Sequence, residues 1–289
     1  MRFLLPFMVL LAVVPAGAAL AQVAADDSTA AAIRRDGLRI ETPRAVVWVG
    51  PGALTEAEAA AFAERLESGL AAIESLIGHG LDSARYGGTR VEAFVGAGVG
   101  ISHVYGSYDH MKHARPWLFL DAEKVRSGEA PYLHEATHLL AWKFGSHSLR
   151  EGFASWVEAE IRSRTAGGGA AIFGATSPAE VDADARARLE LSAASEVVPW
   201  IGRTGFAPAS VTTPRRPKIR ATYYVLSQSF AQHLIREIGI ADFLRVYASD
   251  DPERELERLS GTSLSTWKDR WRAALAALAT SSLRGRGAV

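Results

Sequence analysis

Short apolar runs in the first part of the chain are separated by residues that favour turns. Val, Ile, Trp and Phe are frequent in these runs, and Gly or Pro bounds several of them, which is typical of β-strands. The predicted strands span residues 38–41, 45–49, 91–95 and 117–120. The pattern therefore predicts a small sheet within residues 37–145.

A different spacing follows the second predicted strand. Apolar residues recur there at intervals of three or four, which is the period of one face of an α-helix. These residues are Phe62, Leu66, Leu70, Ile73 and Ile77. Thr55 and Glu58 have the spacing of a capping box, so the helix is predicted to begin there. Gly78 predicts its end.

The second half of the chain has two parts. Residues 167–216 contain many Gly and Pro, and one helix is predicted in them from Pro178. A segment this irregular is often a lid or a cleft rim. From Ile219 the apolar spacing is helical, with Gly239 as a stop and further helices at 240–247, 252–259 and 264–278. The overall prediction is an α+β fold, with an upper α/β lobe at 37–145 and a mostly helical lower lobe at 146–289.

The first 21 residues have the pattern of a cleaved signal peptide. Met1-Arg2 is basic, residues 3–14 are apolar, and Ala19-Leu20-Ala21 is an A-x-A cleavage sequence before Gln22. The apolar run is too short to span a bilayer comfortably, so no stable membrane span is expected after cleavage. We expect a periplasmic or extracellular protein of bacterial type, with a flexible leader at 22–36 and one domain at 37–289.

Composition narrows the chemistry. The chain has no cysteine, so disulfides, thiolate ligands and lipid attachment at a new N-terminal cysteine are not expected. Its formal net charge is zero, which argues against a nucleic-acid or anionic-membrane partner. The one basic cluster, at 215–220, is interpreted as a solvated junction between a loop and a helix, with a polyanion site as the alternative. The sequence does not indicate an oligomeric state.

The pentapeptide His134-Glu135-Ala136-Thr137-His138 is the most specific chemical signal. Residues four apart on a helix are separated by about 40° around its axis, so both imidazoles can reach one metal ion. Glu135 lies to the side, where it can act on a water molecule at that metal. This is the H-E-x-x-H arrangement of zinc hydrolases. It lies in a segment, 131–144, that is predicted to be helical.

Downstream, Glu151-Gly152-Phe153-Ala154 opens a second predicted helix. With the pentapeptide, this sequence resembles the gluzincin metallopeptidases of the peptidase MA-like superfamily. The resemblance covers roughly residues 130–160. It implies one zinc ion per chain, bound by His134, His138 and Glu151, and places Glu158 one layer behind a ligand histidine. Only twelve residues separate His138 from Glu151, whereas eighteen or nineteen are usual in this family, and the longer spacing would select Glu158 instead.

The resemblance also implies a zincin-like fold, with a small mixed sheet, the metal helix and a helical lower lobe. In such folds an edge strand beside the site pairs with extended substrate. By analogy that strand is residues 117–120, while an ordinary core strand is the alternative. His103, His110 and His113 are interpreted as parts of a solvated loop, with a cleft lining or a weak second metal site as the alternatives.

The implied chemistry is peptide hydrolysis by a metal-activated water, with Glu135 as general base. The tetrahedral oxyanion then needs a donor, and family resemblance places a Tyr six residues before the Phe of Ser229-Phe230. That position is Tyr224, with Tyr223 and His233 as alternatives.

The expected function is therefore a secreted or periplasmic zinc peptidase acting on a peptide or protein substrate. The G-x-M-E-N segment of the aminopeptidases is absent from this sequence, which favours an endopeptidase. One alternative is a zincin scaffold used for binding or envelope structure, although the intact Glu135 argues against it. A third is hydrolysis of a non-peptide amide or ester.

Overall fold

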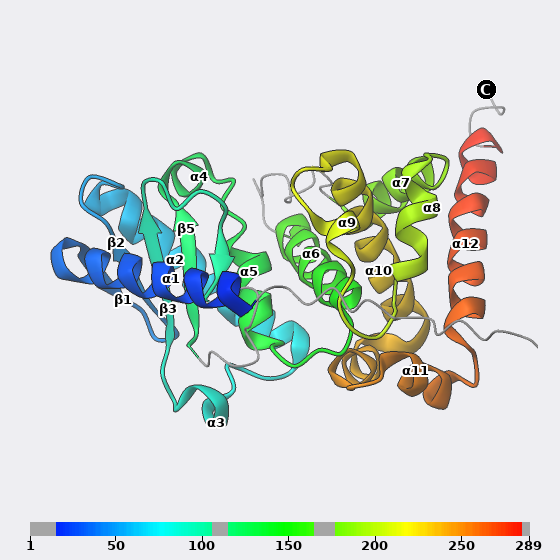
Figure 1. The fold of residues 1–289 in the computed structure, drawn as a ribbon, viewed down its shortest axis with the longest axis horizontal. Coiled ribbons are helices and arrows are strands. Elements are labelled where there is room, and N and C mark those ends of the chain that lie inside the picture. The colour runs from blue at the N-terminus through cyan, green and yellow to red at the C-terminus, as the bar shows by residue number, and fades with distance from the viewer. Residues whose placement is uncertain (1–15, 106–114, 165–176, 285–289) are drawn as a thin grey trace, which may run out of the picture.

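The computed structural model describes residues 16–105, 115–164 and 177–284. The chain is α+β and mostly helical, with one small mixed sheet. The sheet and the first helices form one region, and the later helices form another, with α5 (Tyr132–Leu140) and α6 (His147–Arg164) packed together between them (Figure 1). Within the described residues, no helix is long and apolar enough to cross a membrane.

The sheet has five strands in the order β1-β2-β3-β5-β4. The pairs β2–β3 and β3–β5 are parallel, whereas β1 and β4 pair antiparallel with their neighbours. The strand bounds are β1 Leu38–Glu41, β2 Ala45–Val49, β3 Val91–Gly96, β4 His103–Val104 and β5 Trp117–Asp121. All four strands predicted from the sequence are confirmed.

The assignment of the edge strand is wrong. Residues 117–120 belong to β5, which lies between β3 and β4 and is therefore an interior strand. The edge beside it is β4, in which His103 pairs with Phe119 and Val104 with Leu118. A two-residue strand after a glycine-rich loop has too short an apolar pattern to be recognised in sequence. His103 is accordingly part of the sheet edge and not of a solvated loop, while His110 and His113 lie outside the described residues.

Helix α2 (Glu56–Ile77) covers one face of the sheet. Thr55 and Glu58 form the predicted capping box, and Gly78 ends the helix in the left-handed conformation. The predicted apolar stripe is buried, which confirms the helix and its bounds. Its buried large residues are Phe62, Leu66, Leu70, Ile73 and Ile77.

Helix α1 (Ala16–Asp36) replaces the flexible leader that was expected at 22–36. Alternate strand residues form a second apolar cluster with this helix, which lies over the sheet in Figure 1. The cluster contains Ala30, Ile33, Phe94, Tyr105, Trp117 and Phe119. The segment is rich in Ala, Asp and Ser and has little amphipathic pattern of its own. The helix is ordered because it packs on the sheet, which is formed by segments far along the chain, and composition does not predict such a contact.

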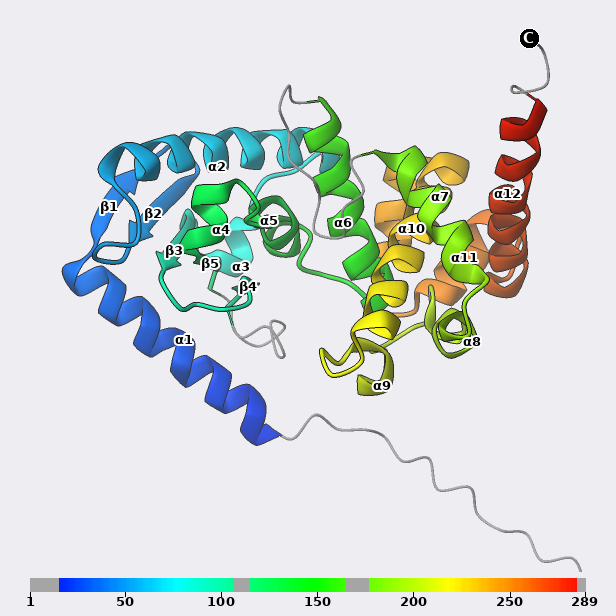
Figure 2. The ribbon, with the colours of Figure 1, turned by 90° about the horizontal axis from the view of Figure 1, so that it is seen from above.

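The C-terminal region is built around α10 (Pro217–Ala248), which packs along α6. Gly239 interrupts α10 with non-helical φ and ψ, as its predicted role as a stop implies. Segment 177–216 is more helical than expected, although its helices are mostly short. The remaining helices are α3 Ser83–Tyr86, α4 Ala122–Ser127, α7 Pro178–Leu189, α8 Ala193–Val197, η1 Val198–Trp200, α9 Ala209–Thr212, α11 Pro252–Ser260 and α12 Leu264–Arg284. Figure 2 shows α12 at the far end from the sheet.

Candidate metal centre

The two histidines of the pentapeptide lie on one face of α5. Their Nε2 atoms are 3.1 Å apart, and their rings are nearly perpendicular. Both side chains are buried. Helix α5 ends at Leu140, not at residue 144 as predicted, so only nine residues carry this geometry. The i, i+4 spacing still brings both imidazoles to the same point, because they lie one turn apart within the helix.

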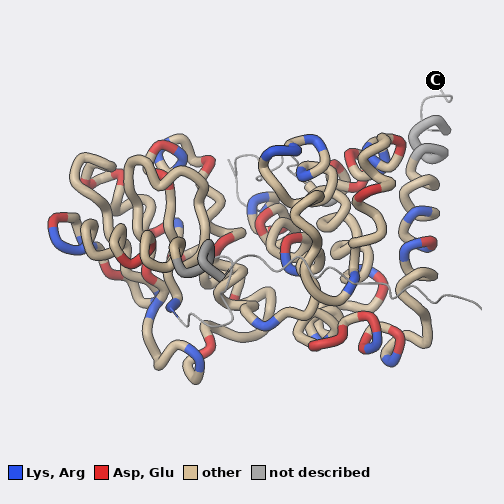
Figure 3. Tube along the Cα trace, in the orientation of Figure 1, with Lys and Arg blue, Asp and Glu red and all other residues tan. Residues whose placement is uncertain are grey.

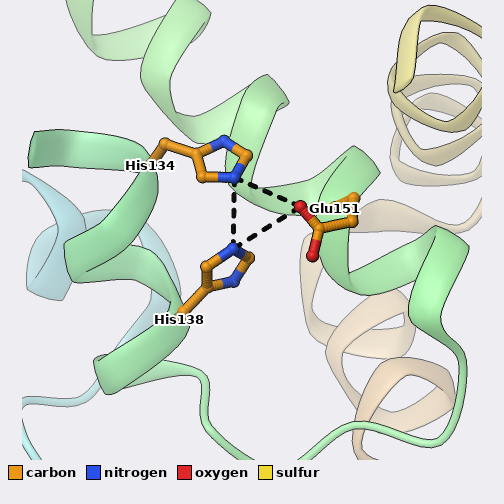
Figure 4. A group of neighbouring side chains, drawn as sticks. All are labelled: His134, His138 and Glu151. Atoms are coloured by element: carbon orange, nitrogen blue, oxygen red, sulfur yellow. Dashed lines mark hydrogen bonds and ion pairs between the residues drawn. The ribbon is translucent and has the colours of Figure 1, made fainter. Parts of the chain in front are cut away.

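Glu151 meets the histidines from the first half of α6 (Figure 4). Its Oε2 lies 3.3 Å from Nε2 of His134 and 3.7 Å from Nε2 of His138. Donors about 2.0–2.1 Å from a tetrahedral metal ion lie about 3.3 Å from one another. The three side chains therefore fit a metal ion, and they are the group among the described residues whose spacing allows this.

The link between α5 and α6 explains how a twelve-residue spacing suffices. Gly145 lies so close to the chain that follows α10 that a Cβ on it would be 1.9 Å from the carbonyl oxygen of Ser249. The backbone N–H of Gly145 also donates to the carbonyl of Tyr247, at 3.0 Å. The link is thus held tightly, and α6 can begin at His147, one helical turn before Glu151.

The glycine after Glu151 has a packing role. A Cβ on Gly152 would lie 2.2 Å from the carbonyl oxygen of Ser227, so the close approach of α6 and α10 requires a residue without a side chain. This approach brings Tyr223 and Tyr224 of α10 near enough to Glu151 that its charge acts on both hydroxyls. The motif thus combines a candidate ligand with the helix contact that builds the site around it.

Three neighbours of the triad were not singled out by the sequence. Arg150 donates from Nη1 to Oε1 of Glu151, which leaves Oε2 facing the histidines. His147 approaches the same Oε1 with its Nε2, at 3.6 Å. Ser155 Oγ lies 3.4 Å from Nδ1 of His134. The signal that could have found two of them is helical spacing, because residues 147, 151 and 155 share one face of α6.

Glu158 is buried and forms an ion pair with Arg162, at 3.0 Å. Its charge contributes to raising the pKa of His134. The expected role of Glu158 behind a ligand histidine stays a prediction, since Ser155 is the side chain that faces Nδ1 of His134. Nδ1 of His138 is buried and has no hydrogen-bond partner among the described residues.

Burial and neighbouring charges act in opposite directions on the protonation of the triad. Burial opposes ionisation of Glu151, but Arg150, His138 and His134 together hold its pKa well below the ordinary range. Burial, and then the charge of Arg150, lower the pKa of His138 well below its usual value. Both groups therefore favour the deprotonated form that a metal ligand needs. Burial also opposes the charged form of His134, yet its hydrogen bond to Glu151 and nearby carboxylates raise its pKa.

Glu135 is buried next to His134 on α5. Within the described part of the chain, no hydrogen bond or ion pair reaches its carboxylate. Burial raises its pKa to about 7, and the charge of Glu151 adds to this, while His134 and Arg150 oppose it. A carboxylate with such a pKa can accept a proton and return it near neutral pH.

The three candidate donors to the oxyanion have different surroundings. Tyr223 is fully buried, and its hydroxyl is 2.8 Å from Nδ1 of His147. Tyr224 is only partly buried; burial and the charge of Glu151 raise its pKa. His233 lies away from the triad, with its ring 6.0 Å from that of Trp267 in α12. Of the three, Tyr224 is the one that combines nearness to Glu151 with partial exposure.

His103 adds a link between the edge strand and α1. Its Nε2 lies 3.0 Å from Oδ1 of Asp26, a buried carboxylate that also accepts from Gln22 at 2.7 Å. Burial opposes the charged form of His103, but Asp26 and the carbonyl of Ile101 raise its pKa. Helix α1 is therefore tied to β4 by polar contacts as well as by the apolar cluster.

A scan against protein-family models and a search of curated proteins find no match to this chain. What the site can do therefore follows from its own geometry.

Proposed function

We propose that this chain is an exported zinc-dependent peptidase in which Glu135 is the general base. The observation that carries the proposal is the convergence of two histidine Nε2 atoms and Oε2 of Glu151, at 3.1–3.7 Å, beside a buried carboxylate whose pKa is about 7. Two imidazoles, one carboxylate and an open position are typical of catalytic zinc, whereas structural sites close all four positions.

A zinc ion held by His134, His138 and Glu151 would supply Lewis acidity toward the scissile carbonyl and toward an attacking water. Glu135 removes a proton from that water and delivers it to the leaving amine. Arg150 holds Oε1 of Glu151 through a charge-assisted hydrogen bond, so that Oε2 stays directed at the histidines. The chain's own groups thus provide both the proton transfer and the orientation of the ligand carboxylate.

Tyr224 is the proposed donor to the tetrahedral oxyanion. Its hydroxyl would be needed only when charge develops on the carbonyl oxygen, so Tyr224→Phe should lower kcat by about 10²–10³ and leave KM and zinc content nearly unchanged. The matched variant is Tyr223→Phe, whose hydroxyl is engaged with His147. Full activity of Tyr224→Phe would remove it from the mechanism.

The proposed substrate is an extended peptide bound along β4. This strand is the edge of the sheet and contacts α5, the helix that carries Glu135. Peptide backbone can add to such an edge through main-chain hydrogen bonds. Acidic and basic residues are interspersed in both regions (Figure 3), and the formal net charge is zero, so no nucleic-acid partner is expected.

Export rests on the signal-peptide pattern of residues 1–21. Gln22, Asp26, Ala30 and Ile33 supply contacts of α1 with the sheet region, and all follow the proposed cleavage point. Cleavage before Gln22 would therefore leave these contacts in place. The experiment that checks export is N-terminal sequencing of the protein recovered from the periplasm or medium.

The test of function is a peptide-library cleavage profile of the zinc-loaded mature chain, beside its Glu135→Ala variant. Wild type should cleave within peptides. The variant should bind zinc and remain folded but lose hydrolysis, since Glu135 lies beside the triad without being part of it. Glu129→Ala, at an exposed position just before α5, is the control and should stay active. Zinc binding without any cleavage would favour the scaffold alternative.

A further inference from the structure

Five aromatic rings form a continuous row beside the candidate metal centre. In order they are Tyr224, Tyr223, His147, Phe206 and Phe144. Successive ring centroids are 5.8, 5.8, 5.7 and 5.9 Å apart. These separations are within the range of favourable aromatic pairs. The row joins residues from α10, the start of α6, the link between α5 and α6, and the segment between η1 and α9.

The row passes directly alongside Glu151. His147 is its middle member, with Nε2 at 3.6 Å from Oε1 of Glu151 and Nδ1 at 2.8 Å from the hydroxyl of Tyr223. Exposure changes along the row: Tyr223 is 0% exposed, whereas Phe206 is 61% exposed. The rings therefore lead from the candidate ligand to the surface of the protein.

The residues just before Phe206 are hydrogen-bonded to α6, to the link before it and to the chain after α10. The backbone N–H of His147 donates to the carbonyl of Gly205 at 2.9 Å, and the N–H of Gly205 donates to the carbonyl of Gly145 at 2.7 Å. Gly202 donates to Ser148 Oγ at 2.7 Å, and Thr204 Oγ1 donates to Asp251 at 3.1 Å. Gly205 has a φ of +86°, which favours glycine at this turn. The backbone that leads to Phe206 is thus anchored up to the residue before it.

Single exposed apolar side chains are common on proteins and need no explanation by themselves. Phe206 differs because the backbone just before it is anchored and because its ring lies 5.7 Å from that of His147, a neighbour of Glu151. Among the described residues, the one large apolar side chain that is more exposed is Ile101, at 63%, and it lies two residues before His103 of the edge strand. The two most exposed apolar side chains thus belong to segments next to the candidate site.

We infer that Phe206 and Phe144 form a subsite for an aromatic or large aliphatic side chain of the peptide, reached from Glu151 through His147. Both rings are uncharged and meet edge to face at 81°, an arrangement that can accept a further ring or a branched aliphatic chain. Arg150 lies under Phe144, 5.4 Å from its centroid, and its charge is already paired with Glu151. This inference rests on the proposed peptidase function and adds a substrate class to it.

The test uses three peptides that differ at one position, with Phe, Leu or Ala where the library profile shows a preference for large apolar side chains. The enzymes are wild type, Phe206→Ala, Phe206→Leu and the control Leu191→Ala. Leu191 is 50% exposed and lines a separate cavity of about 880 Å³ between α7–α8 and α12. Phe206→Ala should lower kcat/KM for the Phe and Leu peptides by about 10- to 100-fold, the scale of an apolar contact in a specificity pocket.

With the Ala peptide, the kcat/KM of Phe206→Ala should change by less than about threefold. Phe206→Leu should restore part of the preference for large side chains. Leu191→Ala should behave as wild type with all three peptides. An equal loss on every peptide would show that Phe206 only supports His147, and no loss on any peptide would show that it is outside the substrate path. Either result overturns the subsite.

Failure of the peptidase proposal is distinguishable from failure of the subsite. If zinc-loaded wild type cleaves no peptide, the proposed function fails. Binding of N-acetyl-phenylalanine amide and N-acetyl-alanine amide is then compared by saturation-transfer NMR. A signal for the phenylalanine amide that Phe206→Ala removes and Leu191→Ala keeps supports the subsite. Equal signals in wild type and Phe206→Ala overturn it.

Discussion

Two polar clusters in this protein are each centred on a buried carboxylate, and their hydrogen bonding differs. In the C-terminal region, Asp182 accepts from Ser229 Oγ and from Arg236 Nη1, both at 2.7 Å, and Trp271 Nε1 donates to Ser229 Oγ at 2.9 Å. We call these four residues the polar knot. Ser229 and Trp271 donate within the knot, and Arg236, whose side chain is half exposed, donates to its carboxylate. The knot therefore joins α7, α10 and α12 through its own hydrogen bonds.

The triad of α5 and α6 is arranged differently. Two Nε2 atoms and one carboxylate oxygen converge, so lone pairs outnumber the protons that could lie between them. A proton can satisfy one pair of such atoms, whereas a divalent cation satisfies all three. The comparison suggests that a buried cluster built for stability closes its own hydrogen bonds, and that one built for a ligand leaves its acceptors directed at a common point.

The largest expected effect is on metal affinity. Glu151→Gln removes the charge that offsets the cation, and it should weaken zinc binding by two orders of magnitude or more. This is the share of one ligand in a total zinc-binding free energy of about 10–16 kcal/mol. Competition with a chromogenic chelator at neutral pH measures this. Glu160→Gln on the same helix, whose partner is Arg164, should keep wild-type affinity. Equal affinity of the two variants would place the ligand elsewhere.

A smaller effect is expected on the stability of the metal-free protein. The pKa of Glu135 is about 7 in the folded state against an ordinary 4.5, so the folded chain keeps a proton that the unfolded chain releases between those pH values. Stability therefore falls as pH rises from about 4.5 to 7. Glu135→Gln cannot lose this proton and should be more stable than wild type at pH 7.5, by on the order of 2 kcal/mol, but not at pH 4.

Urea unfolding of both chains after metal removal, at the two pH values, measures the difference. Stability curves that run parallel from pH 4 to 7.5 would mean that Glu135 is not held in its neutral form by burial. The prediction sharpens the comparison because Asp182 is also a buried carboxylate, and it has hydrogen bonds that Glu135 lacks among the described residues.

A substitution in the polar knot should lower the stability of the protein and leave zinc binding unchanged. Asp182→Ala leaves Ser229 and Trp271 with an incomplete hydrogen-bond chain, and it should lower the free energy of unfolding by about 1–2 kcal/mol. Zinc affinity should be unchanged, because the knot contains no member of the triad. Asp184→Ala is the matched control on α7, since its partner Arg188 lies on the same helix and its side chain is 37% exposed. A fall in zinc affinity with Asp182→Ala would show that the two clusters are coupled.

Local pattern was sufficient for several features. The capping box at Thr55, the strands at 38–41 and 45–49 and the break at Gly239 each depend on a few neighbouring residues, so the sequence predicts them. The approach of Glu151 to the histidines also follows from a local motif, although the link is short. Gly145 and Gly152 explain why a short link works, and their close contacts are visible only in three dimensions.

Features that depend on distant segments were missed. The composition of 22–36 resembles that of a leader, yet these residues are helical because the far face of the sheet offers an apolar surface. Strand β4 has two residues and exists because β5 offers an unpaired edge. These features depend on tertiary packing, so neither residue propensity nor sequence spacing predicts them.

The smallest expected effect concerns Ser155, which faces Nδ1 of His134 at 3.4 Å. A side chain that orients a ligand histidine typically contributes about 10–100-fold to affinity, and this contact is long, so Ser155→Ala should weaken zinc binding by about tenfold. Ser163→Ala, an exposed serine on the same helix, is the control. Glu158→Gln belongs in the same titration, with its melting temperature measured separately because the substitution also weakens the pair with Arg162. If Glu158→Gln weakens zinc binding more than Ser155→Ala does, Glu158 is the group that orients the histidine, and the hydroxyl of Ser155 only fills space beside it.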